Sequence, residues 1–447
     1  MKKLIQTLKN IWSIEDLRAR IISTLGFLLI YRFGSFVVLP GIDPAHLEAL
    51  KSQTATGVLG ILDMFSGGAF SNASVFALGI MPYISASIVI QLLGIAVPYF
   101  QRLQREGESG RRKINQITRY LTVIILVVQA PSYLVNLYSQ LPAEAFAMNN
   151  TWFKISSTII LTAGTMFIMW LGERITDKGI GNGISLIIMI GIIARLPFAF
   201  VGEVGSRFTE TAGGGLVMLL IELVVLLAVI GASILLVQGT RKVPVQYAKR
   251  IVGNKQYGGV RQYIPLKVNA AGVMPIIFAQ AIMFLPVTIA GFSQSESMTA
   301  FATAFANPLG WVYNLTQAIL IIAFTYFYTA ITINPNQMAE DMKRNGGFIP
   351  GVKPGKKTAD FLDSVMSKIT LPGSFFLAFV AILPAFAMMA GVTQQFAYFY
   401  GGTSLLIMVG VVLDTLQQIE SHLLMRHYDG LMKSGRIKGR TGGAAAF

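Results

Sequence analysis

The residue types that carry out most enzyme chemistry are scarce in this chain. It contains no cysteine and only three histidines, His46, His422 and His427, the last two without the HExxH spacing of a zinc protease. Without cysteine there is no disulfide framework, no thiolate nucleophile and no Cys-ligated zinc. We find no candidate catalytic constellation, and we therefore expect neither an enzyme nor a bound cofactor or metal.

One glycine-rich segment superficially resembles a phosphate-binding loop. Residues 179–183 read Gly-Ile-Gly-Asn-Gly, but no strand precedes them and no Lys-Ser/Thr pair follows. A flexible entry to a helix, with Asn182 near its N-cap, explains the same residues. The segment therefore predicts a helix start rather than a nucleotide site.

Two carboxylates within long apolar runs, Glu222 and Asp414, need weighing because ionisable residues at membrane depth are functional by default. We find no plausible cationic or second carboxylate partner for either in mid-span, whereas a proton relay needs a chain of such groups. Structural or interfacial roles are therefore favoured for both.

Three uncharged polar residues, Gln91, Gln129 and Asn269, also lie within apolar runs. Each could make an interhelical hydrogen bond of modest strength. Alternatively, each could take part in a polar contact between two helices that must separate. The residues alone leave both interpretations open.

The elements that must position these residues are long apolar helices. Hydrophobic residues make up 53% of the 447 residues and charged residues only 13%, about half of the roughly 25% found in soluble domains. This composition excludes a soluble enzyme and a disordered or fibrous chain. Ten runs are suited to cross ~30 Å of hydrocarbon as helices. They are residues 21–39, 74–97, 120–141, 153–171, 182–200, 216–237, 270–289, 311–333, 371–390 and 402–419.

The basic residues predict the orientation of these spans. The net charge is +15. All but five of the 36 lysines and arginines fall in the N-terminal arm, in the loops that follow the second, fourth, sixth and eighth spans, or in the C-terminal tail. Positive residues concentrate on the cytoplasmic side, so we expect both termini to be cytoplasmic. An odd-numbered half reverses its orientation when repeated, so a five-plus-five duplication would be inverted. The five residues left for the opposite face are Arg32, Lys51, Lys154, Arg195 and Arg207.

A short apolar segment interrupts the pattern of spans. Residues 57–65 (GVLGILDMF) are too few to cross a membrane, and Ser66-Gly67-Gly68 then stops a helix. Irregular backbone at membrane depth survives only inside protein or beside an aqueous cavity. The segment is either a re-entrant element in a cavity mouth or an interfacial helix on the outer surface, and the residues alone do not decide.

Several longer strings carry more specific information. They are 64–68 (MFSGG), 76–86 (FALGIMPYISA), 106–113 (EGESGRRK), 179–185 (GIGNGIS), 269–275 (NAAGVMP), 347–351 (GFIPG) and 402–406 (GTSLL). In this order, they closely resemble the SecY family, the central subunits of the bacterial protein-conducting channel. The resemblance extends from about Leu17 to Lys438.

The resemblance implies an all-α integral membrane protein. Its ten transmembrane helices would form two inverted five-helix halves, a clamshell around an hourglass pore, with a short re-entrant plug helix. The clamshell would open laterally, where the second and third helices of one half face the seventh and eighth helices of the other. The expected regions are a cytoplasmic amphipathic segment 1–20, an N-terminal half 21–200 with the plug at about 57–70, an outer hinge loop 201–215, a C-terminal half 216–419 and a cytoplasmic tail 420–447.

The resemblance also implies roles for particular residues. The waist of the pore would be a ring of isoleucines: Ile80, Ile84, Ile184, Ile188, Ile277 and Ile407. The plug would include Gly60, Ile61, Leu62, Asp63, Met64 and Phe65, and would settle the open question about the short segment. The lateral gate would include Ser85, Gln91, Gln129, Asn269 and Leu285. Two basic loops, at about 239–268 and 334–370, would dock the SecA ATPase and the ribosome through Arg241, Lys249, Arg250, Lys255, Lys353 and Lys356.

The implied function is to move unfolded secretory polypeptides across the bacterial cytoplasmic membrane and to release transmembrane segments sideways into lipid. The implied partners are SecE and SecG in a heterotrimer, SecA, the ribosome, signal peptides, nascent polypeptides, membrane lipid, and the accessory proteins SecDF and YidC. A pore for arbitrary polypeptide must hold no sequence tightly, so an apolar constriction that seals by dewetting suits it. The chain has no nucleotide motif, so a partner must supply the force.

Two departures from the family and one rival interpretation remain. Lys353 stands where the family usually has Arg, and Lys255-Gln256 stands where it has a basic pair. Lysine keeps the charge but loses the bidentate geometry of arginine, which affects the expected details of SecA docking.

The rival interpretation is an ion-coupled secondary transporter of a small solute. It predicts placed polar or charged groups and a titratable carboxylate at the midplane.

Overall fold

The structure is a computed structural model. It describes residues 11–48, 50, 60, 63–146, 150–208, 215–247, 250–252, 255–257, 261–290, 304–305 and 307–433. Residues 1–10 of the expected N-terminal segment, most of residues 209–215 of the expected hinge loop and residues 434–447 of the tail therefore lie outside the described part.

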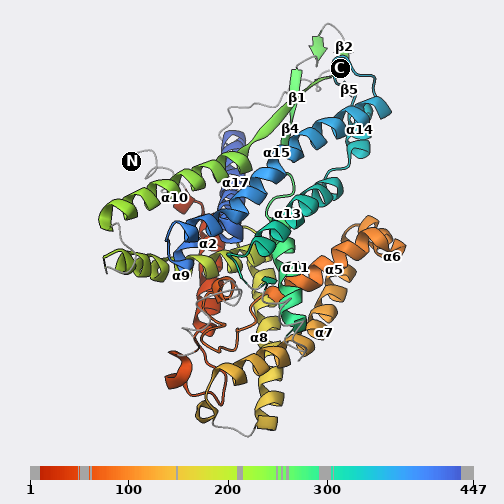
Figure 1. The fold of residues 1–447 in the computed structure, drawn as a ribbon. Coiled ribbons are helices and arrows are strands. Elements are labelled where there is room, and N and C mark those ends of the chain that lie inside the picture. The colour runs from red at the N-terminus through yellow and green to blue at the C-terminus, as the bar shows by residue number, and fades with distance from the viewer. Residues whose placement is uncertain are drawn as a thin grey trace.

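The described chain is mostly α-helical (Figure 1). The helices in chain order are α2 (Glu15–Gly34), α5 (Met81–Ala96), α6 (Pro98–Arg105), α7 (Glu108–Gln140), α8 (Asn150–Lys178), α9 (Gly183–Phe208), α10 (Gly215–Gln238), α11 (Met274–Ala290), α13 (Trp311–Thr332), α14 (Pro335–Arg344), α15 (Lys356–Met389), α16 (Gln394–Ala397) and α17 (Gly402–Lys433). Two short 3-10 helices, η1 (Pro44–His46) and η2 (Ala143–Ala145), lie in the connections.

Seven helices in the described part are long and apolar enough to cross a membrane: α7, α8, α9, α10, α13 continuing into α14, α15 and α17. α5 and α6 together make an eighth if they form one span bent by 100°. The other runs expected to span fall on α2 and on α11, whose apolar part is shorter. The chain is therefore a multi-span helical protein.

For the second expected span, residues 74–97, the predicted N-terminal boundary is wrong. The helix α5 begins at Met81, because Gly79 has a φ of +55° and Pro82 lies in the first turn, where proline fits. Residues 74–80 form turns instead. Their backbone is paired inside the protein, since the Val75 N–H donates to the Val37 carbonyl at 2.9 Å and Ser74 forms a β-bridge with Val38. Internal pairing is what makes irregular backbone tolerable at membrane depth.

The helix start expected at the glycine-rich segment is confirmed. α9 begins at Gly183, and the Asn182 side-chain oxygen accepts from the backbone N–H groups of Ile184 and Ser185 at 3.1 and 3.3 Å. Asparagine is a preferred N-cap because its side chain satisfies donors that have no partner within the helix.

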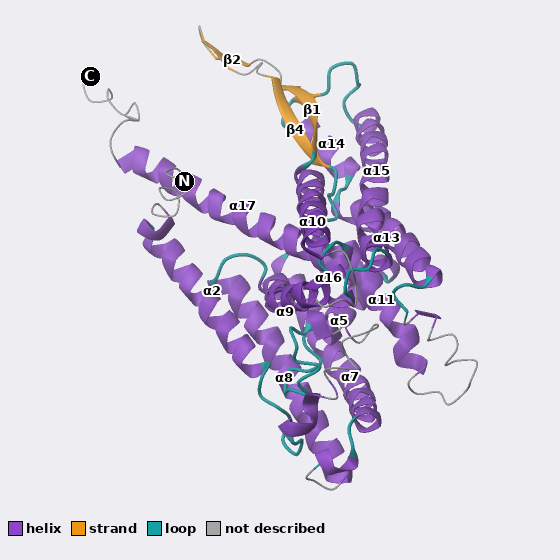
Figure 2. Ribbon diagram, turned by 60° about the vertical axis from the view of Figure 1, so that its left-hand side comes forward, coloured by secondary structure: helices purple, strands orange, loops and turns teal. Residues whose placement is uncertain are grey.

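The first long basic loop is a β-ribbon rather than an irregular loop. β1 (Thr240–Tyr247) pairs antiparallel with β4 (Arg261–Lys267), and β5 (Gly347–Phe348) joins the other edge of β1. A second pair, β2 (Arg250–Val252) and β3 (Lys255–Tyr257), lies beyond it. Figures 1 and 2 show the ribbon projecting at one end of the helices, beside α14 and the start of α15.

This ribbon and the second basic loop share one hydrophobic core. Valines at alternate positions of β1 are buried with residues of β4, α14 and α15; the core is Val243, Val245, Leu266, Met342, Ile349, Leu362 and Met366. We call the unit of residues 239–268 and 334–370 the sheet module. Its core makes the two basic loops one structural unit.

Candidate channel constriction

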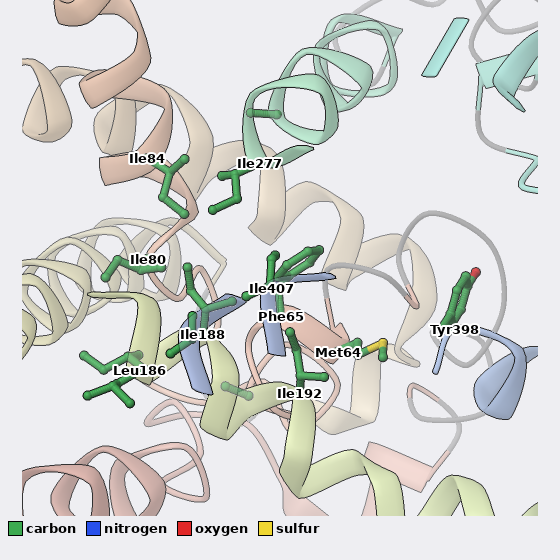
Figure 3. Close-up of a cluster of buried hydrophobic side chains, with 14 of the residues drawn as sticks. Met64, Phe65, Ile80, Ile84, Leu186, Ile188, Ile192, Ile277, Tyr398 and Ile407 are labelled. Atoms are coloured by element: carbon green, nitrogen blue, oxygen red, sulfur yellow. The ribbon is translucent and has the colours of Figure 1, made fainter. Parts of the chain in front are cut away.

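The six isoleucines expected to form a ring converge in one cluster. Ile80 and Ile84 come from the start of α5, Ile184 and Ile188 from α9, and one each from α11 and α17, Ile277 and Ile407. All are buried except Ile184, which is partly buried against the same cluster. Figure 3 shows Ile84 and Ile277 pointing toward one another, with Ile80, Ile188 and Ile407 beside them. The six isoleucines, which come from α5 and the residue before it, α9, α11 and α17, thus belong to or pack against one hydrophobic cluster.

The end of the short apolar segment packs on this cluster. Met64 and Phe65 are buried in it, and Figure 3 places Phe65 next to Ile407. The Ser404 hydroxyl at the start of α17 lies 3.4 Å from the Met64 sulfur, and the Tyr31 hydroxyl donates to the Ser66 carbonyl at 3.1 Å. Gly60 is partly buried, whereas Ile61 and Leu62 lie outside the described residues. The described part of the segment is thus held inside the protein.

The segment also carries an ion pair to α9. Arg195 pairs with Asp63, and the side chains are 31% and 10% exposed. The same Arg195 nitrogen, Nη2, donates to the Ser71 hydroxyl at 2.7 Å. From α2, Arg32 Nη1 donates to the Gly67 carbonyl at 2.7 Å. Two arginines that charge counting assigned to the outer face therefore hold residues 63–71.

Of the residues expected at a lateral gate, most lie on helices near the cluster. Ser85 and Gln91 are on α5 and bond within it, Ser85 to the Met81 carbonyl at 3.1 Å and Gln91 to the Ser87 hydroxyl at 3.3 Å. Gln129 is half-buried on α7, which packs against α5. Leu285 is on α11, which also contacts α5, but its side chain lies outside the described part.

Asn269 differs from the other residues expected at the gate, because it is buried and one of its atoms has no partner in the described part of the chain. It lies between β4 and α11, and its Oδ1 has no hydrogen-bond partner among the described residues. A buried polar atom without a partner is uncommon and calls for an explanation.

The expectation that Glu222 lacks a partner was wrong. On α10, Glu222 is buried and pairs with Arg207 near the end of α9, while Arg207 Nε also donates to Glu203 at 3.0 Å. Arg207 Nη2 donates to the Gly391 carbonyl at 2.9 Å, and Glu203 accepts from the backbone N–H of Thr393 at 2.8 Å and from its hydroxyl. Glu203 and Arg207 are four residues apart on α9, whereas Glu222 lies on α10 and Gly391 and Thr393 precede α16, so the fold is needed to complete the cluster.

A second polar contact joins the glycine-rich segment to α17. The Gly181 N–H donates to the Gln418 side-chain oxygen at 2.8 Å. Neighbouring residues of the segment bond to α2, since the Ile180 N–H donates to the Thr24 hydroxyl at 3.1 Å and Arg20 donates to the Gly179 carbonyl at 3.3 Å. The segment therefore ties the start of α9 to both α2 and α17.

The residues expected to dock partners belong to the sheet module. Arg241 on β1, Lys353 before α15 and Lys356 at its first position are exposed. Arg250 and Lys255 lie on β2 and β3, where the side chains are outside the described part, and so is all of Lys249. Exposed basic side chains on a folded unit suit the binding of a polyanionic or acidic surface.

Sequence reasoning missed the roles of Arg195, Arg207 and Glu203. A signal was present, because each is an ionisable residue within or next to an otherwise apolar run, and such residues need a partner. Within the described residues, no group of three or more His, Asp or Glu side chains could hold a metal ion.

Comparison with known proteins now decides the family. The sequence profile of the SecY family matches residues 74–416. The protein translocase subunit SecY of Halalkalibacterium halodurans is 44% identical over 439 residues, covering 96% of this chain and 100% of that protein. The one from Chlamydia muridarum is 41% identical, covering 97% and 99%. The chain belongs to the SecY family.

Solved channel structures share the fold of this SecY-family chain. A protein-conducting channel superposes with a TM-score of 0.61 at 18% identity, covering 90% of this chain and 92% of that one. Sec61 in a canine ribosome–channel complex superposes with a TM-score of 0.58 at 17% identity, with the same coverage. The chain is a channel subunit of the protein translocase and not an enzyme. None of these comparisons supports a solute transporter.

Proposed function

We propose that the chain forms the polypeptide pore itself, as a clamshell of ten transmembrane helices in two inverted halves, residues 21–200 and 216–419. In this proposal the six isoleucines are the waist of an hourglass pore and residues 57–70 are its plug. The observation that carries the proposal is the convergence of the isoleucines from α5, α9, α11 and α17, with Phe65 packed on them. Two of these helices belong to each half, so the cluster lies where the halves meet.

An apolar waist fits the task of passing many different chains. Hydrating a narrow apolar neck is unfavourable, so the neck excludes water and ions at rest. Isoleucine side chains are stiff at χ1, so they form a defined collar. Because the collar comes from separate helices, it can widen when those helices move apart.

The lateral gate is proposed between α5 and α7 on one side and α11 and α13 on the other. α5 contacts α11, and Ile84 and Ile277 face one another there. Ser85, Gln91, Gln129, Asn269 and Leu285 would line the path by which a transmembrane segment leaves for the lipid. We call this contact the front seam. The contacts of α9 and residues 179–182 with α10, residues 391–393 and α17 are the back seam.

Ion conductance tests the waist. Replacing Ile84, Ile188 and Ile407 together with serine makes the collar wettable, so the resting channel should conduct small ions in a planar bilayer. The matched control replaces the same three residues with valine, which keeps the collar apolar and should keep it sealed. Deleting Gly60–Phe65 alone should leak less than the serine variant if the collar is the main barrier. A folded serine variant without added conductance would contradict the assignment.

The proposed partners act on the sheet module. Sec61 and Ssh1 were solved on ribosomes, with TM-scores of 0.58 and 0.60 to this chain. By analogy, we propose that the ribosome and SecA dock on the basic residues of the module and deliver signal peptides and nascent polypeptides. SecE and SecG are the proposed companions in a heterotrimer, with SecDF and YidC as accessory proteins.

The proposed location is the bacterial inner membrane, with both termini in the cytoplasm. The distribution of Lys and Arg supports this orientation. Because the chain has no cysteine, single cysteines report sidedness cleanly. An impermeant thiol reagent should label a cysteine at Ser52 from outside intact cells, but not one at Gln104 or Lys357. The reverse pattern would invert the topology.

A further inference from the structure

Two segments at the constriction each carry a single charged residue. Asp63 is the only charge in residues 57–71, and Arg195 is the only charge in residues 182–200. Isolated charges in apolar surroundings are costly unless they are paired. The fold brings these two together, although they are 132 positions apart in the chain.

The pair belongs to a closed set of bonds. Arg195 contacts Asp63 Oδ2 and donates to the Ser71 hydroxyl at 2.7 Å. The Ser71 N–H donates to Asp63 Oδ1 at 2.8 Å, and the Gly68 N–H donates to the Asp63 carbonyl at 2.8 Å. Arg195 therefore holds both ends of the turn that residues 63–71 make.

The backbone of this turn is shaped to admit the arginine. Gly67 and Gly68 have φ values of +65° and +92°, where side chains are rarely accommodated. A Cβ at Gly68 would lie 3.0 Å from Arg195 Nη2, and one at Gly67 would lie 2.7 Å from Arg32 Nη1. Both glycines therefore permit a close approach of a guanidinium, but only Arg195 meets a carboxylate; Arg32 meets a carbonyl.

The pair borders a small, partly open recess, which is lined also by Phe198, Ala199 and Tyr398. The Arg195 side chain is 31% exposed, whereas that of Arg207 in the α9–α10 cluster is 2% exposed. Separated charges at the recess can be hydrated, and this lowers the cost of breaking the pair compared with a dry site. The geometry therefore suits a contact that forms and breaks.

We propose that Arg195 is a positioning residue that latches the plug in its closed place through Asp63 and Ser71. This proposal rests on the proposed plug and pore. In the resting channel, the ion pair between Arg195 and Asp63 stabilises the closed plug in addition to the apolar packing of Met64 and Phe65. When a polypeptide enters the waist and displaces the plug, Asp63 and Arg195 part and are hydrated from the recess. The latch thus sets how often the resting plug leaves.

The test follows the plug position and the seal in the same variants. Cysteines at Met64 and Ser404, whose side chains touch, report plug position by cross-linking with a short bifunctional thiol reagent. Planar-bilayer recording of the full chain, purified with its accompanying membrane subunits, reports the resting seal. The variants are Arg195→Gln, Asp63→Asn, both together and Arg195→Lys. Arg119→Gln is the matched control, because Arg119 forms an exposed pair with Glu173.

The latch predicts a coupled pattern across the variants. Arg195→Gln and Asp63→Asn each leave one charged side chain without its partner. Each variant should therefore lower the yield of cross-linking and raise the resting open probability of the channel about tenfold. A tenfold change lies within the range of interaction free energies measured between contacting residues. The double variant strands no charge and should return most of the way to the parent. Arg195→Lys keeps the charge and should fall between. Arg119→Gln should change nothing.

Three results would overturn the proposal. One is unchanged cross-linking and conductance in Arg195→Gln or, should that variant not fold, in Asp63→Asn. The second is a double variant whose effect is the sum of the single effects, because independent residues are additive. The third is an equal effect of Arg119→Gln.

These experiments distinguish a failure of the proposed latch from a failure of the proposed pore. If the triple serine variant of the waist conducts while the latch variants behave like the parent, the pore stands and the latch falls. If the triple serine variant does not conduct and deleting Gly60–Phe65 has no effect on the parent, the pore assignment falls first.

Discussion

The two seams between the proposed halves differ in the polar and ionic bonds that cross them. The back seam is polar and ionic: Arg207, Glu203 and Glu222 join the end of α9 to α10, Thr393 bonds to Glu203, and Gln418 bonds to Gly181. At the front seam, where α5 contacts α11, Ile84 and Ile277 face each other, and the polar side chains of Ser85 and Gln91 bond within α5. Among the described side chains, no hydrogen bond or ion pair links α5 to α11.

This difference indicates which side moves. Separating apolar helices in a bilayer exchanges protein contacts for lipid contacts, and no hydrophobic driving force opposes the exchange. Separating a buried ion pair strands charges, which costs far more. We therefore expect the proposed clamshell to open at the front seam and to turn about the back seam. The same contrast would let a transmembrane segment leave for the lipid at the front seam.

The largest expected effect comes from closing the front seam. Cysteines at Ile84 and Ile277, joined by a short cleavable cross-linker, should abolish import of a preprotein into proteoliposomes, because α5 and α11 can no longer part. Cleaving the linker in the same sample should restore import and serves as the control. Full import with the linker in place would mean that the halves open elsewhere.

The next effect comes from breaking the back seam. Arg207→Gln leaves Glu203 and Glu222 buried without their cation, so the free energy of unfolding in detergent should fall by about 3–5 kcal/mol. The matched control, Arg119→Gln on α7, removes an exposed arginine and should cost at most about 1 kcal/mol. Equal losses in the two variants would remove the basis for a rigid back seam.

A smaller effect is expected at a distance from both seams. Reversing the charges of Arg250 and Lys353 with glutamate should weaken association with SecA or ribosomes about tenfold at moderate salt, because rim charges act mainly on encounter. Stability and the resting seal should stay at parent values, which separates docking from opening. Unchanged affinity would instead assign these charges to orientation and lipid headgroups.

The smallest effect is expected within the back seam itself. Glu222 Oε2 has no hydrogen-bond partner among the described residues, and Arg207 also pairs with Glu203. Glu222→Gln keeps an acceptor for Arg207 and removes the excess negative charge of the cluster. The free energy of unfolding in detergent should therefore change by less than about 1 kcal/mol. A loss as large as that of Arg207→Gln would show that Glu222, and not Glu203, is the main partner.

The sequence predicted elements better than contacts. Long uncharged runs predicted helices, and Asn182 predicted where α9 begins, because both signals are local. The alternating burial of Val243 and Val245 on β1 follows a period of two that was present in the sequence. The many basic residues of the segment favoured a solvated loop over a strand, so the ribbon was predicted as a loop.

The partners of single charges could not be predicted, for a physical reason. Glu222 and Arg207 are on different helices, and Asp63 and Arg195 are far apart in the chain, so no local pattern relates them. The convergence of six isoleucines was likewise implied only by family resemblance. Isoleucine in an apolar helix has no distinguishing periodicity, and only packing places it at a waist.

Distances across both seams test the central claim most directly. Spin labels at Val89 on α5 and Ile282 on α11 report the front seam, and labels at Val201 on α9 and Leu220 on α10 report the back seam. Pulsed electron paramagnetic resonance compares the resting channel with one that holds a trapped polypeptide. The front distance should lengthen while the back distance stays the same. A back distance that lengthens, or a front distance that does not, would contradict a clamshell hinged at Arg207.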